Sequence, residues 1–285
     1  MAQVAERLLV STEWLSEHLS DPNLRIVDIR GHVLPASEPL PHYFNHEDDY
    51  KKSHIPAAVF VDWVKAITDP DDPRHAKIAK PERYAALMSQ LGIGDDTFVV
   101  AYDDAAGMFA ARLWWSLNYY GHKKVVVLDG GWNKWVAEGR PVTAEVPSPE
   151  PTQFIPRPDK RWMRTADEVA AALHTPALLL DVRTPQEFEG QFARAIRKGH
   201  IPGAVNFPRI EMLSPNGTML SPEALRQRLA EKGVKGDSRE VICYCNGGVS
   251  ASYAMLALKA AGFDNAAVYD GSWKEWGNDE RRPLE

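Results

Sequence analysis

The apolar residues of this chain fall into short runs that are separated by longer amphipathic segments. The runs TFVVAY (97–102) and KVVVLDG (124–130) are rich in β-branched residues, which is typical of strands buried on both faces. Two amphipathic segments begin with a proline, Pro81 and Pro222, and the second also has Ser221 as a helix N-cap. Strands that alternate with helices predict an α/β fold, in which a parallel sheet has helices on both faces.

The order of these segments occurs twice along the chain. Five blocks of the first half match five blocks of the second half in the same order, which chance similarity would not preserve. The matched pairs are LRIVDIRG (24–31) with LLLDVRT (178–184), KSHIPAAVFVD (52–62) with KGHIPGAVNFP (198–208), PERYAALMSQLGI (81–93) with PEALRQRLAEKGV (222–234), FVVAYDDAAGMFAA (98–111) with EVICYCNGGVSASY (240–253), and VVVLDGGWNKWVAEGRP (125–141) with AAVYDGSWKEWGNDERRP (266–283). The chain is therefore predicted to be a tandem duplication of one α/β domain.

A proline-rich segment marks the joint between the two copies. The stretch EVPSPEPTQFIPRP (145–158) has little periodicity, which is typical of a stiff, extended linker. We expect a first domain at 1–145, a linker at 146–158 and a second domain at 159–285.

Composition and charge narrow the class of protein. Of the 285 residues, 44% are hydrophobic and 25% are charged, which predicts a globular chain rather than a disordered one. The net charge of −6 provides no basic field for a polyanion, so neither nucleic acid nor an anionic membrane is expected as a partner. No apolar run approaches the roughly 20 residues that span a bilayer, and the N-terminus lacks the layout of a signal peptide. We expect a cytoplasmic protein.

The chain has two cysteines, Cys243 and Cys245, with different expected roles. A disulfide between residues i and i+2 would be strained, and the pair falls short of the four ligands of a structural zinc site. Cys243 lies inside the predicted strand and is expected to be a small core residue. Cys245 follows that strand, at the carboxyl end where ligands of parallel sheets collect.

The loop after Cys245 predicts a reactive thiolate. Its residues are Asn246, Gly247, Gly248, Val249 and Ser250. A loop that leads into a helix points backbone N–H groups at one place, and together with the helix dipole they favour an anionic sulfur. The glycines allow positive φ and predict a close approach to the loop. The first copy has Asp103 at the matching position, so packing does not demand a thiol there.

These features together resemble the rhodanese family. The chain carries HIPGAVN (200–206), YDGSW (269–273), LDGGW (128–132) and RLWW (112–115) beside the six-residue cysteine loop. It is similar over nearly its whole length to the two-domain thiosulfate and 3-mercaptopyruvate sulfurtransferases. The resemblance implies two rhodanese domains, of which only the second is catalytic. It also implies that Cys245 takes sulfane sulfur from a small donor, holds it as a persulfide, and passes it to cyanide or a thiol, including a thiol of a protein.

The composition of the loop bears on the sulfur donor. Thiosulfate-specific relatives have the loop Cys-Arg-Lys-Gly-Val-Thr, and mercaptopyruvate-specific ones have Cys-Gly-Ser-Gly-Val-Thr. The loop here, Cys-Asn-Gly-Gly-Val-Ser, lacks the cations and has Gly247 in place of the serine. Its charge is nearer to the mercaptopyruvate type, and the donor stays open between the two. Ser250 matches the closing hydroxyl residue, and it either caps the following helix or contacts the persulfide.

Basic residues outside the loop are candidates for binding the donor. Relatives place carboxylate-binding arginines before the second His-Ile-Pro turn, where this chain has Arg194 and Arg197, although one of those arginines corresponds to Glu187 here. The alternative is that these arginines are solvated loop residues. His75 lies where relatives have a histidine at the cleft between the domains, but the aspartate linked to that histidine corresponds to Val64.

Asp181 and Arg183 follow the first strand of the second copy, as Asp28 and Arg30 do in the first. The resemblance implies that the Asp181–Arg183 pair holds neighbouring loops, including the cysteine loop, through hydrogen bonds and an ion pair. Neither a cofactor nor a metal is expected. The nine histidines are scattered along the chain, and no phosphate-binding glycine fingerprint is present.

Two other classes of protein compete with this interpretation. A cysteine phosphatase would need an arginine six positions after the cysteine, where this chain has Ala251. A duplicated scaffold that binds proteins or senses sulfur without catalysis is the main alternative. An unreactive Cys245 would favour that alternative, because a buried structural thiol resists alkylation at neutral pH.

Overall fold

The structure is a computed structural model that describes residues 7–75, 77–236 and 239–285. Its first half is built on a parallel sheet with the strand order β1–β7–β6–β2–β5. The strands are β1 (Leu9–Val10), β2 (Leu24–Asp28), β5 (Val59–Phe60), β6 (Phe98–Tyr102) and β7 (Val125–Leu128). A separate antiparallel pair, β3 (Gly31–Val33) with β4 (Tyr43–Asn45), follows β2 along the chain.

The second half repeats the same sheet. Its parallel strands have the order β8–β12–β11–β9–β10, which matches the first sheet position for position. They are β8 (Met163–Arg164), β9 (Leu178–Asp181), β10 (Val205–Asn206), β11 (Val241–Tyr244) and β12 (Ala266–Tyr269). In both sheets the central strand ends in a tyrosine that pairs in register with an aspartate, Tyr102 with Asp28 and Tyr244 with Asp181. The predicted duplication and the parallel sheets are confirmed.

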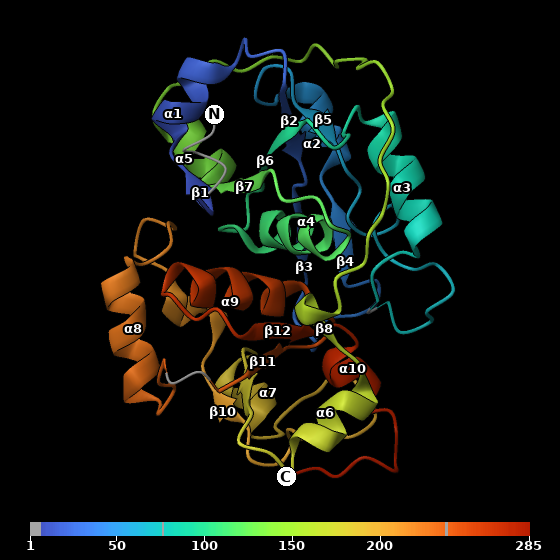
Figure 1. Cartoon of the computed structure of the whole chain (residues 1–285), viewed down its shortest axis with the longest axis vertical. Helices are drawn as coiled ribbons and strands as arrows, with labels where there is room; N and C mark the ends of the chain where they lie inside the picture. The colour runs from blue at the N-terminus through green and yellow to red at the C-terminus, as the bar shows by residue number, and fades with distance from the viewer. Residues whose placement is uncertain (1–6, 76, 237–238) are drawn as a thin grey trace.

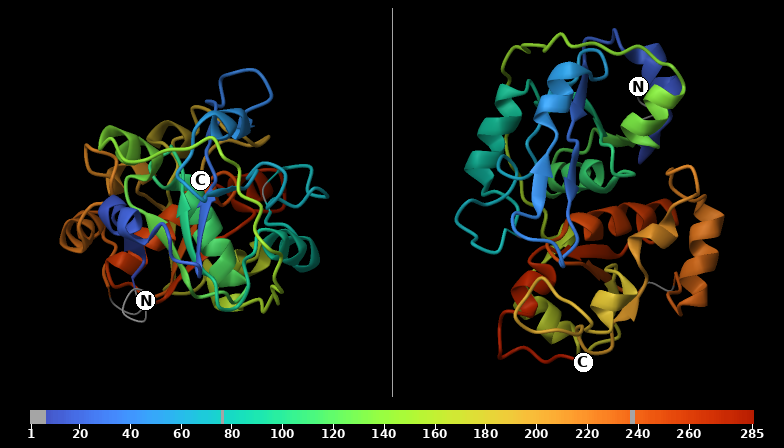
Figure 2. Two further views of the ribbon diagram at one scale, coloured as in Figure 1. Left: turned by 90° about the horizontal axis from the view of Figure 1, so that it is seen from above. Right: turned by 180° about the vertical axis from the view of Figure 1, so that it is seen from behind.

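Helices cover both faces of each sheet, and the two halves are stacked along the long axis of the molecule (Figure 1, Figure 2). The outer faces pack against α1 (Thr12–His18) and α5 (Gly131–Ala137) in the first half, and against α6 (Ala166–Ala172) and α10 (Ser272–Trp276) in the second. The inner faces pack against α3 (Pro81–Gln90) and α4 (Met108–Tyr119), and against α8 (Pro222–Glu231) and α9 (Val249–Ala260). The short segments α2 (Glu47–Lys52), α7 (Pro185–Phe188), η1 (Lys160–Trp162) and η2 (Arg209–Met212) complete the described elements.

The predicted helix starts are also confirmed. Helix α3 begins at Pro81, and α8 begins at Pro222 after the N-cap Ser221. The Ser221 hydroxyl accepts a hydrogen bond from the backbone N–H of Ala224 at 3.2 Å. Proline has no N–H to leave unsatisfied in the first helical turn, so both starts follow from local chemistry.

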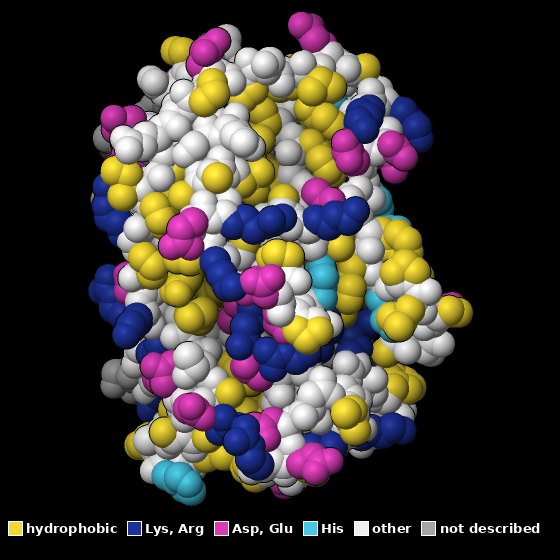
Figure 3. Space-filling model, turned by 90° about the vertical axis from the view of Figure 1, so that its right-hand side faces the viewer, with side chains coloured by type: hydrophobic (Ala, Val, Ile, Leu, Met, Phe, Trp, Pro, Cys, Tyr) yellow, Lys and Arg dark blue, Asp and Glu magenta, His cyan; other side chains and the backbone are white. Residues whose placement is uncertain are grey.

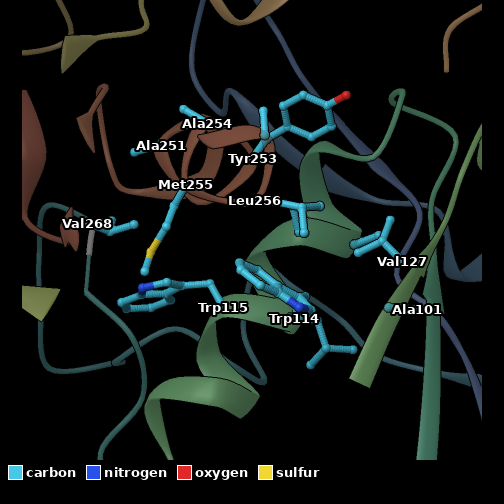
Figure 4. Packing of buried hydrophobic residues seen from close by; sticks show 14 of the residues in the cluster. Ala101, Trp114, Trp115, Val127, Ala251, Tyr253, Ala254, Met255, Leu256 and Val268 are labelled. Carbon is cyan, nitrogen blue, oxygen red and sulfur yellow. The ribbon is translucent and has the colours of Figure 1, made fainter. Parts of the chain in front are cut away.

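Helices α4 and α9 pack against each other and join the two halves. Trp114 and Trp115 of α4 meet Met255 and Leu256 of α9 (Figure 4). Each of these side chains is at most 1% exposed, and burial of a large apolar side chain stabilises a fold by about 1.5–3 kcal/mol. One hydrophobic core therefore runs through both copies.

The chain between α5 and η1 has no helix or strand and lies along the first half. The backbone N–H of Thr152 donates to the Ser89 carbonyl, and that of Phe154 donates to the Ser89 hydroxyl at 3.0 Å. The Phe154 side chain is buried in the core that the two halves share. This segment is thus fixed against the first domain along part of its length. Within the described ranges, no helix combines the length and the apolar character needed to cross a membrane.

Candidate active site

Cys245 lies at the carboxyl end of the central strand β11, directly before α9, and 5% of its surface is exposed. The start of α10 anchors its loop. The Ser272 hydroxyl accepts hydrogen bonds from the backbone N–H groups of Cys245 and Gly248, both at 3.1 Å. The N–H of Trp273 donates to the Cys245 carbonyl at 3.0 Å. The YDGSW segment therefore fixes the position of the sulfur, a role of Ser272 that the sequence analysis did not identify.

Gly248 is required by the packing of the two halves rather than by a ligand. Its φ of +76° is in the left-handed region, and a Cβ there would lie 2.7 Å from Arg112 Nη1 and 2.8 Å from Asp270 Oδ1. Arg112 and Asp270 form an ion pair of 2.6 Å between the two halves, with each side chain 5% exposed. The close approach predicted for the glycines is present at Gly248, but a buried ion pair makes it.

The first turn of α9 offers backbone N–H groups to the loop. Gly248 is the N-cap and no side chain caps the helix. Within the described chain the N–H groups of Ser250 and Ala251 have no hydrogen-bond partner, as is usual in a first helical turn. In the first half the matching N–H groups, those of Phe109 and Ala110, donate to the Asp103 carboxylate at 2.7 and 2.8 Å. The site of Cys245 is therefore built like one that holds an anion.

A cleft of about 310 Å³ lies where the two halves meet, with Cys245 in its wall. The predicted loop residues Asn246, Gly247, Val249 and Ser250 line it as well, whereas Gly248 is not among the lining residues. The Ser250 hydroxyl donates to Met108 Sδ of the first half at 3.3 Å and does not cap α9, so of its two expected roles the capping one is wrong.

Arg194 lines the cleft and Arg197 does not. The Arg194 guanidinium donates to the Leu34 carbonyl and lies 3.0 Å from His42 Nδ1, so residues of the first half hold it at the cleft. The Arg197 guanidinium instead donates to backbone carbonyls, among them that of Arg282 at 2.8 Å. Arg197 therefore fastens the C-terminal segment, and the structure does not support its predicted role in binding substrate.

His75 lies in the cleft wall on the side of the first half. Its Nε2 is 2.6 Å from the Val64 carbonyl, and its ring stacks on Tyr43 with 4.9 Å between the ring centres. The resemblance implied an aspartate as the partner of this histidine, and here the backbone carbonyl of Val64 is the partner. Burial lowers the pKa of His75 below its ordinary value, so the imidazole is neutral at pH 7.

Asp181 and Arg183 form a buried ion pair beneath the cysteine loop. Both side chains are fully buried, and Arg183 donates from Nε and Nη2 to the Asp181 carboxylate. Arg183 Nη2 also donates to the Gly199 carbonyl at 2.9 Å, which ties the His-Ile-Pro turn to the end of β9. Arg183 itself lines the cleft. The pair holds loops together as the resemblance implied, although neither side chain bonds the cysteine loop directly.

Four charged residues of the cleft wall were not identified from the sequence as ligands: Arg112, Glu187, Arg209 and Lys274. Glu187 accepts a hydrogen bond from Asn246 Nδ2 at 2.8 Å. Arg209 Nη1 donates to the Ala106 carbonyl of the first half at 3.2 Å. On the face shown in Figure 3, Lys and Arg side chains gather across the middle of the molecule, with carboxylates among them. Among the described lining residues Glu187 is the one carboxylate, so the cleft favours anionic ligands.

No group of three or more histidine, cysteine, aspartate or glutamate side chains in the described part of the chain is arranged to hold a metal ion.

Two copies of a parallel α/β domain, one with a cysteine in an anion-holding loop and one without, define the class of tandem sulfur-transfer proteins. The model of the Rhodanese-like domain matches residues 11–138 and 165–279, and the chain belongs to the rhodanese family.

Named relatives agree with this assignment. The chain is 36% identical to the sulfur carrier protein TtuD of Thermus thermophilus, over 98% of this chain and 96% of that protein. It is 35% identical to the thiosulfate sulfurtransferase of Rattus norvegicus, over 96% of this chain and 93% of that protein. The crystal structure of the 3-mercaptopyruvate sulfurtransferase SseA of Escherichia coli matches with a TM-score of 0.83 and 30% identity, over 93% of this chain and 98% of that one.

Proposed function

We propose that this protein is a sulfurtransferase that moves sulfane sulfur from thiosulfate or 3-mercaptopyruvate to a thiophilic acceptor through a persulfide on Cys245. The observation that carries the proposal is the position of Cys245. Its thiol lies in the wall of a cleft, before unpaired backbone N–H groups whose counterparts in the first half bind a carboxylate. Such a place stabilises both a thiolate and the persulfide anion that replaces it.

The first half-reaction loads the sulfur. The Cys245 thiolate attacks the outer sulfur of thiosulfate, a new S–S bond forms, and sulfite leaves with the electron pair of the bond that breaks. With 3-mercaptopyruvate the bond that breaks is C–S. Its electron pair passes to the enolate of pyruvate, which takes up the proton of the donor thiol. In both cases Cys245 ends as a persulfide anion, and no external oxidant or reductant is needed.

The second half-reaction unloads the sulfur. Cyanide or a thiolate attacks the outer sulfur, and the Cys245 thiolate leaves with the electron pair of the S–S bond. Splitting the transfer in this way lets donor and acceptor use the cleft in turn. A protein thiol is included among the proposed acceptors, since the relative from Thermus thermophilus is named a sulfur carrier protein. Both cysteines are free thiols, which suits a reducing compartment, and we place the reaction in the cytoplasm.

Site roles are assigned from the contacts described above. Cys245 is the nucleophile, and Asn246, Gly247, Val249 and Ser250 form the wall of the cleft around its sulfur, while Gly248 shapes the loop. Arg194 is kept as a donor-binding cation, and His75 as a neutral wall residue that positions Tyr43. Asp181 and Arg183 hold the loops at the base of the site.

The test compares initial rates with each donor, cyanide being the acceptor, for the native protein and for Cys245→Ala. Loss of thiocyanate formation in Cys245→Ala, by on the order of 10⁴-fold or more, would support the assignment of the nucleophile. Cys243→Ala is the matched control, because Cys243 is fully buried and burial raises its pKa far above the ordinary thiol value. It should keep its activity and still gain the mass of one sulfur atom when treated with donor alone. Equal rates in the native protein and Cys245→Ala would contradict the assignment of Cys245, and no thiocyanate from either donor would leave a non-catalytic binding or sulfur-sensing module.

A further inference from the structure

Lys274 is a lysine whose side chain is buried in the wall of the cleft. Its backbone N–H donates to the Asn246 carbonyl at 3.0 Å, which holds the residue against the cysteine loop. Its ammonium donates to the His75 carbonyl at 3.0 Å and lies 4.1 Å from the centre of the Tyr43 ring. The residue is 6% exposed. Because lysines usually keep the ammonium in water, this burial calls for a partner that compensates the charge.

The protein itself does not provide that partner as an ion pair. Among the described residues no carboxylate oxygen is recorded within 4.0 Å of Lys274 Nζ. Asp72 acts on it at longer range and is bound to Arg74 at 2.8 Å. The contacts that remain are a carbonyl and an aromatic ring, so the ammonium has no carboxylate partner among the described residues although Lys274 lines the cleft that also contains Cys245. A buried cation in the wall of a reaction cleft is suited to an anion that arrives with the substrate.

We propose that Lys274 binds the anionic end of the sulfur donor and selects donors with two negative charges, such as thiosulfate, over donors with one, such as 3-mercaptopyruvate. This inference rests on the function proposed above. Lys274 of α10 would then supply the positive charge that the loop Cys-Asn-Gly-Gly-Val-Ser lacks. The outer sulfur of thiosulfate is one bond away from the sulfonate oxygens, so a cation beside Cys245 contacts them when the sulfur is attacked. The same cation then stabilises the sulfite that leaves.

The protonation of Lys274 makes this selection dependent on pH. Burial, together with the positive charge of Arg194, lowers the pKa of Lys274 to about 7, although Cys245 and Asp72 act in the opposite direction. The free amine does not attract a dianion. As the pH rises through about 7 the ammonium loses its proton, so the preference for thiosulfate should fall.

Of the other groups that face Lys274, Cys245 attacks both donors, so its contribution cancels in the ratio of the two rates, and the remaining groups keep their charge as the pH rises through 7. Burial lowers the pKa of His75 and raises that of Tyr43, so both are neutral at pH 7. Arg194 and Arg209, the other cations of the cleft without a carboxylate partner among the described residues, stay protonated because a guanidinium does not titrate near neutrality. A change of donor preference near pH 7 is therefore specific to Lys274.

The experiment measures the first half-reaction alone, as sulfite released from thiosulfate and pyruvate released from 3-mercaptopyruvate, between pH 6 and pH 9. Native protein, Lys274→Met and Lys274→Arg are compared. Lys232→Met is the matched control, since Lys232 is exposed at the end of α8. For Lys274→Met we expect kcat/KM with thiosulfate to fall on the order of 10- to 100-fold, and with 3-mercaptopyruvate to change less than about 3-fold.

The change of donor preference with pH distinguishes a lysine that binds the donor from one that only stabilises the fold, because replacing the latter would leave that change as it is in the native protein. In the native protein the ratio of kcat/KM for thiosulfate to that for 3-mercaptopyruvate should fall as the pH rises through 7. In Lys274→Arg the ratio should stay high and flat, because the arginine keeps its charge, and in Lys274→Met it should stay low and flat. A Lys274→Met protein that loses both activities equally, or that keeps the native pH profile, would overturn the inference.

A binding measurement separates failure of this inference from failure of the proposed function. Cys245→Ser and Cys245→Ser/Lys274→Met are titrated with thiosulfate in a calorimeter, where no sulfur transfer is needed. Weaker binding in the double variant supports the role of Lys274 even if turnover were absent. Equal binding in both overturns the role of Lys274, while release of sulfite by the native protein would still uphold the sulfurtransferase.

Discussion

The loops that follow the central strands of the two halves have the same construction and different occupants. In the first half the Asp103 carboxylate accepts four backbone hydrogen bonds of 2.7–2.9 Å, from Ala105, Gly107, Phe109 and Ala110. In the second half Cys245 stands at the same place and the N–H groups of the first helical turn stay available. Duplication has thus produced one loop whose N–H groups are bound by its own side chain, and one in which the N–H groups of Ser250 and Ala251 have no partner among the described residues.

The comparison also shows what each loop needs from its neighbours. Both helices that follow are capped by a glycine in the left-handed region, Gly107 with φ +81° and Gly248 with φ +76°. The loop from Asp103 to Gly107 is one residue longer than the loop from Cys245 to Gly248. The two sequence blocks therefore align without a gap up to Asp103 and Cys245, and are offset by one residue from the start of the following helix. In the second half a hydroxyl from α10, that of Ser272, replaces the carboxylate as the acceptor for the Gly248 N–H. The Cys245 thiol is therefore not needed as a hydrogen-bond acceptor that holds the loop in place.

The largest expected effect comes from replacing the side chains of Cys245 and Asp103, which stand at the matching positions of the two loops. Cys245→Ala should abolish transfer and lower the free energy of unfolding by less than about 1 kcal/mol, because the thiol carries no hydrogen bond that the loop depends on. Asp103→Ala should do the reverse. It leaves four N–H donors unsatisfied, so the free energy of unfolding should fall by about 3 kcal/mol, measured by urea denaturation, while the folded variant keeps its kcat. A stable Asp103→Ala protein would break the comparison.

A smaller effect is expected from pH on Asp28, the residue of the first half that matches Asp181. Arg183 donates to Asp181 through two nitrogens, whereas Arg30 donates to Asp28 through Nε and turns its Nη2 to the Ser53 carbonyl. Burial raises the pKa of Asp28 to about 6, from 3.8. Between those values the folded protein holds a proton that the unfolded chain has released. The free energy of unfolding should therefore fall by about 2 kcal/mol as the pH rises from 4 to 6.

Denaturation curves at a series of pH values test this expectation. Asp28→Asn should remove the slope, because an amide cannot take up the proton. Asp181→Asn is the matched variant and should leave the slope in place. A slope that survives in Asp28→Asn would assign it to another group.

The smallest effect on stability is expected from the two cap glycines. Gly107→Ala and Gly248→Ala each force a Cβ into the left-handed region, which costs about 1–2 kcal/mol. They should differ in activity. The new Cβ at 107 would meet the Tyr253 ring at 2.9 Å, but at 248 it would meet the Arg112–Asp270 ion pair and shift the cysteine loop. We expect kcat/KM to fall about 10-fold in Gly248→Ala alone, measured with thiosulfate and cyanide. Equal kinetics in both variants would mean that the loop tolerates the shift.

The fold and the position of Cys245 at the end of the central strand could be predicted from the sequence because their signals are local. A strand, a turn and a helix follow one another around Cys245. The first copy has Asp103 at the matching position, which indicates that packing does not require a cysteine there. The same is true of Asp181 and Arg183, whose spacing of two residues lets one side chain bond the other.

The rest of the site depends on which segments meet in space, and no local pattern encodes that. Arg194 and Arg197 lie three residues apart and look equivalent in the sequence, yet one faces the cleft and the other binds carbonyls of the C-terminal segment. Lys274 lies in a short helix where a lysine normally points to water. It is buried because Tyr43 and His75 of the other half cover it. Gly248 suggested a bound ligand, but the approaching group belongs to Arg112, 136 positions earlier.

The core shared by α4 and α9 determines whether the two halves can unfold or move independently of each other. Because Trp114, Trp115, Met255 and Leu256 fill a single interior, separating the halves would expose the hydrophobic surface of both. The pair should melt as one cooperative unit, and cutting the segment between the halves should not release two independent domains. On the function proposed above, the first copy then acts as a fixed wall of the cleft, and acceptors have to enter without the two halves moving apart.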